Sequence, residues 1–152
     1  MSQDGAGVDL ETSLGYLLKE ASSALRAAME EVLRPLGMSV THYSCLELLA
    51  QRPGLSSSEL ARGTFVTRQS MNVLLQALER DGYVTRAAEA PVGKVLPTRL
   101  TPRGRRSLEK ASAAVRAVEV RMLAGITEAE QAAVFGILQR MTRSLRDGHD
   151  GA

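Results

Sequence analysis

Residues Leu55–Gly104 read LSSSELARGTFVTRQSMNVLLQALERDGYVTRAAEAPVGKVLPTRLTPRG. A short helix is predicted at the start of this stretch, because Ser56 is followed three residues later by Glu59, the spacing of a capping box. Thr67 is a cap for a second helix, which we expect to end near Asp81, just before a glycine. The pattern is typical of two short helices joined by a tight turn.

Two short apolar runs follow, at 83–88 and 95–100, and the residues between them include a proline and a glycine. This arrangement predicts a β-hairpin with a loop longer than a two-residue turn. Helix, turn, helix and hairpin together predict a winged helix-turn-helix, which we place at 41–101 with a preceding helix capped by Thr41.

Long helical patterns flank this middle part. Apolar positions repeat at helical spacing over 9–34 and over 102–147, with Thr101 and Thr127 as helix caps. We therefore expect a mainly α fold with a small β-hairpin wing, forming one domain over 9–147, and disordered tails at 1–8 and 148–152. The apolar faces of these flanking helices are too wide to be buried by the middle part alone. We therefore predict that 9–34 and 102–147 are dimerisation helices, which bury these faces against a second copy of the chain. The alternative is a helical hairpin within one chain.

Charge is unevenly distributed along the chain. Between Arg52 and Arg106 there are ten Lys/Arg and four Asp/Glu, so this part is +6, while the rest of the chain must be −4 to give the total of +2. A basic segment between acidic flanks is expected where only one region meets a polyanion. We therefore interpret the middle part as a module that binds double-stranded DNA.

One face of the helix after Thr67 carries the side chains suited to reading bases. Met71, Leu74, Leu75 and Leu78 repeat at helical spacing and are expected to face the core. The opposite face then carries Arg, Gln and Asn side chains that can pair with base edges, and there is no acid between Thr67 and Leu78. The predicted DNA-binding residues of the two helices are Ser56, Thr67, Arg68, Gln69, Ser70, Asn72, Val73 and Gln76. A merely solvated helix face is the alternative.

The hairpin is predicted to place Arg86, Lys94 and Arg99 against the minor groove or the flanking phosphates, with Lys94 nearest the loop tip. Just past the second strand, further contacts with the DNA backbone are expected from Arg103, Arg105 and Arg106. If these cations contact phosphates, affinity will fall steeply with salt. Ordinary solvated charge is the alternative for each of them.

Composition excludes several other classes of protein. A single cysteine cannot form a disulfide within the chain, and no apolar run approaches the length of a membrane span, about 20 residues. With two histidines and one cysteine, no nucleophile–base set or metal cluster can be assembled at sensible spacing. We expect a cytoplasmic protein that is not an enzyme, with no metal or cofactor and no membrane association.

The chain resembles the MarR family of bacterial transcription regulators over nearly its whole length. The fragments that carry the resemblance are Leu36-Gly37-Met38-Ser39, Leu46-Glu47-Leu48-Leu49-Ala50, Pro53-Gly54-Leu55-Ser56, Ser58-Glu59-Leu60-Ala61, Val66-Thr67-Arg68-Gln69-Ser70, Leu78-Glu79-Arg80-Asp81-Gly82-Tyr83-Val84 and Leu100-Thr101-Pro102-Arg103-Gly104. The resemblance implies a homodimer that binds a pseudo-palindromic promoter site, a repressor in most members. One segment departs from the family: the wing tip reads Glu89-Ala90-Pro91-Val92-Gly93-Lys94 where many members have Asp-x-Arg.

The resemblance also implies a small lipophilic or phenolic effector, bound between the dimerisation helices and the DNA-binding part. The candidate lining residues are Leu14, Leu17, Leu18, Met38, His42, Cys45 and Leu46. Ordinary core packing between the two parts is the alternative. Two further alternatives are redox sensing through Cys45 and a helix-turn-helix that binds only proteins. The family's peroxide sensors carry their cysteine near the start of the first helix, where this chain has none.

Overall fold

The computed structural model describes residues 7–86 and 97–150. Its elements are α1 (Leu14–Leu33), the 3-10 turn η1 (Arg34–Leu36), α2 (Val40–Gln51), α3 (Ser57–Thr64), α4 (Arg68–Arg80), β1 (Val84–Arg86), β2 (Thr98–Leu100), α5 (Pro102–Met122) and α6 (Glu128–Asp150). This order confirms the predicted fold class, a mainly α chain with one small hairpin. The chain divides after Val118 into two compact units, where the sequence predicted a single domain over 9–147.

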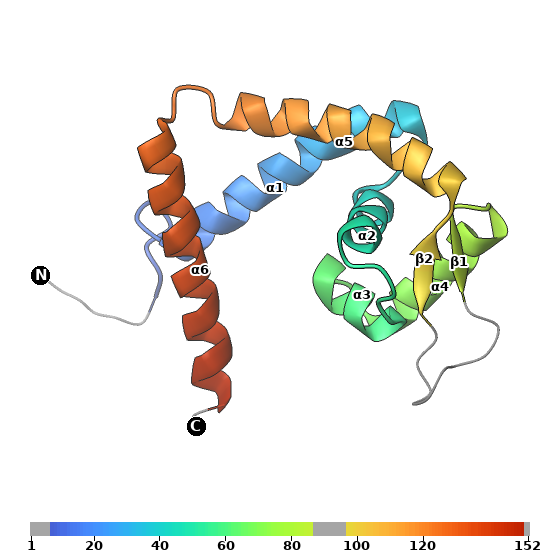
Figure 1. Ribbon diagram of the computed structural model, residues 1–152. Helices are drawn as coiled ribbons and strands as arrows, with labels where there is room; N and C mark the ends of the chain where they lie inside the picture. Colours follow the sequence, from blue (N-terminus) through green and yellow to red (C-terminus); the bar gives the residue numbers. More distant parts are fainter. Residues whose placement is uncertain (1–6, 87–96, 151–152) are drawn as a thin grey trace, which may run out of the picture. The chain divides into compact units, whose positions relative to one another are not determined.

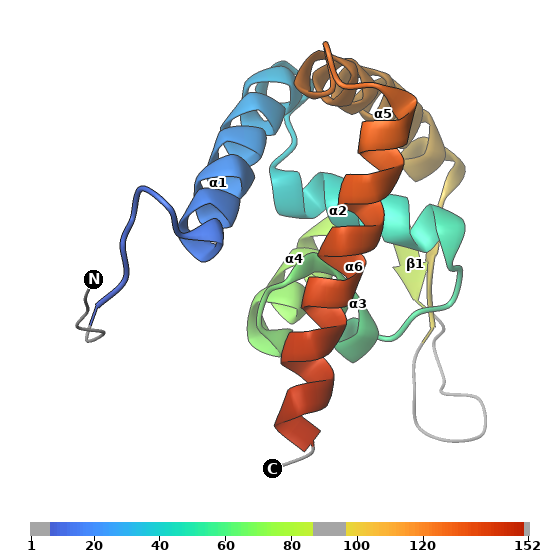
Figure 2. The same ribbon diagram turned by 90° about the vertical axis from the view of Figure 1, so that its left-hand side faces the viewer.

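The first unit holds the helix-turn-helix and the hairpin. Helices α3 and α4 pack on each other, and α2 lies between this pair and the first part of α5 (Figures 1 and 2). The two strands are antiparallel, with Val84 opposite Leu100 and Arg86 opposite Thr98. On its other side β2 meets the chain after α2, since the N–H of Gly54 donates to Thr98 O at 3.2 Å and the N–H of Thr98 donates to Leu55 O at 3.3 Å. The hairpin is therefore anchored to the loop before α3.

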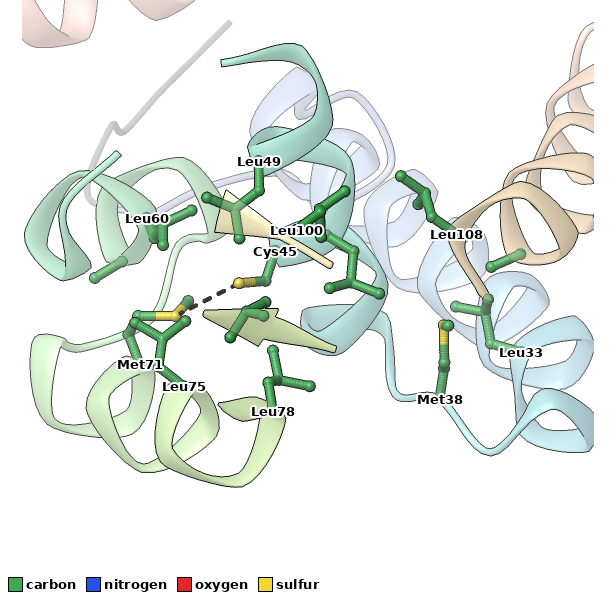
Figure 3. Packing of buried hydrophobic residues seen from close by; sticks show 14 residues of the cluster. Leu33, Met38, Cys45, Leu49, Leu60, Met71, Leu75, Leu78, Leu100 and Leu108 are labelled. Atoms are coloured by element: carbon green, nitrogen blue, oxygen red, sulfur yellow. Dashed lines mark hydrogen bonds between the residues drawn. The ribbon is translucent and has the colours of Figure 1, made fainter. Parts of the chain in front are cut away.

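One apolar cluster holds the first unit together. Leucines dominate it, as expected from a chain with 3% aromatic residues, and Leu46, Leu60, Met71 and Leu75 are fully buried. Leu33 at the end of α1 and Leu108 on α5 belong to the same cluster (Figure 3). Helix α4 is held in this cluster by its packing against α3 and β1 and by the contact of Met71 with Cys45 of α2.

Most helix ends follow the cap residues in the sequence. Ser56 and Glu59 form the predicted capping box of α3, and Thr67 caps α4. The predicted start of the second helix was wrong: Ser39, not Thr41, caps α2, because the Ser39 side chain accepts from the N–H of His42 at 3.0 Å. Serine and threonine both cap helices, so the cap residue alone does not decide between positions 39 and 41. Met38 is buried in the core, and the helix begins directly after it, two residues earlier than predicted.

A hydrogen-bonded carboxylate joins α2 to α5. Glu47 accepts from Tyr43 Oη at 3.0 Å and from Ser112 Oγ at 2.8 Å with one oxygen, and from Gln51 Nε2 at 2.8 Å with the other. Burial alone would raise the pKa of Glu47, but the bonds from Gln51, Ser112 and Tyr43 hold it below its usual value. This cluster fixes the winged part to the long helix that follows it.

The second unit consists mainly of α6. A capping box at its start, Thr127 with Glu130, was predicted from the sequence and is present. The helix continues to Asp150, three residues past the position where we expected the domain to end. Within residues 7–86 and 97–150, no helix is both long enough and apolar enough to span a bilayer.

Candidate DNA-binding surface

Helix α4 presents one polar face to solvent. Met71, Leu75 and Leu78 are buried and Leu74 is partly buried, as the helical spacing predicted. On the other face Arg68, Gln69, Val73 and Gln76 are exposed and Asn72 is half-buried. There is no acid in the first turn. Among the described residues no ion pair involves Arg68, so its guanidinium is available to a ligand.

The start of α4 combines free backbone N–H groups with two hydroxyls. Thr67 Oγ1 accepts from the N–H of Ser70 at 3.0 Å and donates to Ser70 Oγ, also at 3.0 Å. The Thr67 proton is therefore used within the cap, whereas the Ser70 hydroxyl keeps its own proton for an outside acceptor. With the positive end of the helix dipole behind it, this end of α4 suits a phosphate or a base acceptor.

Ser56 lies at the start of α3, and its side chain already has a role in the fold. Its Oγ accepts from the N–H of Glu59 at 3.2 Å, and its own N–H donates to Glu59 Oε1 at 3.0 Å. Backbone and hydroxyl bonds from Ser56 hold the pKa of Glu59 below its usual value, so the carboxylate stays ionised. The Ser56 side chain is thus engaged in the cap, and a contact with DNA would require its hydroxyl proton to turn away from Glu59.

Of the predicted wing cations, Arg99 is the one that the structure places on an outer face. It pairs with Thr85 across the hairpin, and both side chains are exposed. Its Nη2 lies 3.8 Å from the position that a Cβ on Gly54 would occupy, so the guanidinium rests beside the loop before α3. Lys94 and the tip sequence from Glu89 lie outside the described residues.

Arg86 does not occupy the position predicted for a wing cation. It lies on the same side of β1 as the buried Val84, and its Nε and Nη2 are buried without a hydrogen-bond partner in the described part of the chain. Its charge acts on the Cys45 thiol. The physical reason is strand alternation, since residues two apart face the same side. Arg86 therefore points inward rather than toward a duplex.

Arg103 also has a contact within the protein. Its guanidinium carbon lies 4.9 Å from the centroid of the Tyr83 ring, and the other neighbour of that ring is His42, edge-on at 5.3 Å between centroids. Burial lowers the pKa of His42 against a smaller opposing effect of Asp81, which favours the neutral imidazole. These three side chains tie the starts of α2, β1 and α5 together.

The predicted effector residues divide between the buried core and an exposed face of α1. Met38, Cys45 and Leu46 are buried in the core, and His42 is half-buried beside Tyr83. Three of the predicted lining residues instead lie on an exposed face of α1, namely Leu14, Leu17 and Leu18. The hollows found along α6 are lined by other residues, among them Ile137, Met141 and Leu145.

Cys45 has the surroundings of a packing thiol. It is fully buried, its Sγ lies 3.9 Å from Met71 Sδ (Figure 3), and burial raises its pKa to about 12 in spite of Arg86. The thiolate is the reactive form, so this environment disfavours redox sensing. In the described part of the chain no three His, Cys, Asp or Glu side chains gather as metal ligands.

Sequence reasoning missed Phe65, in the turn between α3 and α4. Its side chain is 85% exposed, and its backbone is left-handed, with φ 62°. Helical spacing gave no signal for it, because it lies between the two helices.

Comparison with known proteins gives one consistent family. The family profile described as MarR family matches residues 36–94. The chain is 42% identical over 135 residues to the HTH-type transcriptional repressor Rv2887 of Mycobacterium tuberculosis, covering 89% of this chain and 97% of the relative. A solved complex of Rv2887 with DNA is similar at a TM-score of 0.70 and 40% identity, over 86% of this chain and 98% of that one. The Rv2887 complex with salicylic acid is similar at 0.70 and 42%, over 86% and 96%.

Proposed function

The chain belongs to the MarR family, and we propose that it is a transcriptional repressor that binds double-stranded DNA as a homodimer, through α4. The observation that carries this proposal is the outer face of α4: an exposed arginine, two exposed glutamines and an asparagine, with no acid in its first turn. A helix that served only to keep the protein soluble would not need to be free of acids from Thr67 to Leu78. The solved DNA complex of the relative Rv2887 supports the same reading.

Within this surface we assign two kinds of contact. Arg68 is placed to pair with guanine, while Gln69, Asn72 and Gln76 are suited to adenine. Exposed Val73 supplies an apolar contact to the groove. Phosphate contacts fall to Ser70 and the N–H groups at the start of α4, to Ser56 at the start of α3, and to Arg99 at the hairpin. The phosphate contacts position the helix and the α4 side chains select the sequence.

A homodimer accounts for apolar surface that neither unit covers by itself. On α1 Leu14 is 70% exposed and Leu17 56%, and on α6 Phe135 is 66% exposed and Leu145 81%. A second copy of the chain is the partner that symmetry makes available, and two α4 helices would then meet half-sites about one helical turn apart. Leu17→Glu should shift the chain toward monomer in analytical ultracentrifugation. An unchanged dimer would place the interface away from α1.

We also propose that a small aromatic acid relieves repression, because Rv2887 has been solved with salicylic acid and with p-aminosalicylic acid. In this structure some of the residues predicted to line the effector site are buried in the core, and the others are exposed on α1. These residues can line one ligand site only if a second copy of the chain covers α1 or if the helices move. Titration of salicylate into the protein–DNA complex tests the proposal. Release of DNA at salicylate concentrations that leave the fold intact would support it, and unchanged binding would contradict it.

The experiment for the main proposal is a mobility shift with the DNA upstream of the chain's own gene and of its neighbours. We expect a shifted complex that survives excess nonspecific competitor and weakens steeply with salt. Arg68→Ala should lose the competitor-resistant complex, while Arg143→Ala, an exposed arginine on α6, is the matched control that keeps it. A folded dimer without sequence-selective binding would reject the repressor and favour a protein-interaction module.

A further inference from the structure

Phe65 holds an unfavourable backbone conformation in the turn before α4. Among the described residues it is the one non-glycine with positive φ, at φ 62° and ψ 39°. Crowding between Cβ and the carbonyl oxygen makes this region costly for any residue with a side chain, and glycine is its usual occupant at the end of a helix. The turn itself is closed by backbone bonds, with the N–H of Val66 donating to Ala61 O at 3.1 Å. A glycine at position 65 could make the same turn.

The fold gains little from the ring. Phe65 is 85% exposed, whereas the next residue, Val66, packs against the core. A large apolar side chain in solvent and a strained backbone are both unfavourable for the free protein. A strained backbone persists where the function of the protein requires it, and strained residues cluster at binding sites.

The position of the ring indicates what that requirement is. Phe65 lies two residues before Thr67, the cap of α4, and in a helix-turn-helix the start of the second helix is the end that meets base edges. Exposed Arg62 and Arg68 stand three residues to either side. An apolar ring between two cations suits a polyanion that also displays an apolar group, rather than an apolar protein surface.

We propose that Phe65 is a specificity-determining residue, with its ring against the 5-methyl group of one thymine in each half-site. This methyl is the apolar group that B-DNA shows in its major groove, and phenylalanine is among the side chains that contact it. The inference rests on the proposed function, because it needs α4 to enter the groove. It adds a base preference that the polar face of α4 does not supply.

The test removes the methyl from the DNA and the ring from the protein. The full-length chain first selects duplexes from a random pool, and deoxyuridine then replaces each thymine in turn. We expect one replacement per half-site to weaken wild-type binding about fourfold, the effect of one buried methyl. Phe65→Gly should be weakened on the thymine duplex and should show no further loss with deoxyuridine at that position. Val73→Ala removes the other exposed apolar group of this surface and can lower overall affinity, but it should still lose about fourfold with deoxyuridine at that position, as wild type does.

Stability gives a second readout that does not involve DNA. Phe65→Gly relieves the left-handed strain, so the midpoint of thermal unfolding should rise by roughly 2–4 °C. A lower midpoint would show that the ring supports the fold and would overturn the inference. So would Phe65→Gly binding as tightly as wild type, or losing affinity while it still responds to deoxyuridine at the same position. If the wild-type chain enriches no sequence at all, the proposed function fails and this inference fails with it.

Discussion

Gly104, in the first turn of α5, packs against the backbone of Tyr83 just before β1, and Gly104→Ala is a sharp test of the fold that supports α4. A Cβ at this position would meet the Tyr83 carbonyl oxygen, and it would lie 3.3 Å from Leu100 Cδ2. The same carbonyl accepts from the N–H of Thr101 at 3.1 Å. The added methyl must therefore displace backbone rather than a flexible side-chain end.

The cost can be estimated from three effects. Overpacking in a close-packed site destabilises by about 1–3 kcal/mol. Loss or weakening of the Thr101 hydrogen bond adds about 0.5–1.5 kcal/mol. Alanine is the better helix former by about 1 kcal/mol, which opposes both effects. Together they predict that Gly104→Ala lowers the free energy of unfolding by about 0.5–3.5 kcal/mol.

Thermal unfolding followed by circular dichroism measures this change. The midpoint for Gly104→Ala should fall by roughly 1–14 °C in a chain of this size. Gly136→Ala on α6 is the matched control, because a Cβ there has nothing within 4 Å, and its midpoint should rise slightly. If Gly104→Ala were as stable as wild type, α5 would not approach β1 as closely as described, and the packing argument would be refuted.

Further predictions concern the thiol, the joint at Glu47 and the roles of the cations. Because burial raises the pKa of Cys45 to about 12, the native protein at pH 8 should resist thiol reagents that label the unfolded protein at once in urea. Peroxide should leave DNA binding unchanged. Rapid labelling of the native protein would instead support redox sensing through Cys45. Because the pKa of Glu47 is lowered in the folded protein, its carboxylate stabilises the fold at neutral pH, and this contribution is lost as the pH falls below the ordinary value of 4.5. Wild type should therefore lose more stability than Glu47→Gln between pH 7 and pH 3. Parallel pH profiles of the two proteins would show that the contact between α2 and α5 at Glu47 is not electrostatic. Arg68→Ala should lose about 1–3 kcal/mol of discrimination between bases. Lys94→Ala should weaken binding to all DNA sequences alike and should reduce the dependence of affinity on salt. Equal losses from both changes that do not depend on the DNA sequence would mean that the two roles are wrongly assigned.

Local rules were enough to predict the main elements of the fold. Cap residues and helical spacing gave the starts of α3, α4 and α6 and the buried face of α4, because each depends on residues within one or two turns. The cap of α2 was missed because Ser39 and Thr41 are equally good caps, and burial of Met38 decides between them. The choice between two possible caps depends on packing within the first unit, and the spacing of residues in the sequence gives no information about that packing.

Charge counting was less reliable than periodicity for the candidate site. Arg86 counts as a wing cation by composition, but strand alternation from Val84 turns it inward, and that rule could have been applied to the sequence. Arg103, expected at the phosphates, stays exposed, and its additional contact with Tyr83 follows from the approach of α5 to β1, which spacing does not reveal. Phe65 gave no signal in the sequence, since a left-handed backbone becomes evident only in the structure.

The central claim is that the outer face of α4 reads a DNA sequence. Selection of duplexes from a random pool by the full-length chain at about 150 mM salt, followed by sequencing, tests it most directly. We expect an inverted repeat whose half-site centres lie about 10 base pairs apart, and a changed preference at one position of each half-site for Arg68→Ala. Enrichment of no sequence by a folded dimer, or the same repeat selected equally well by Arg68→Ala, would contradict it.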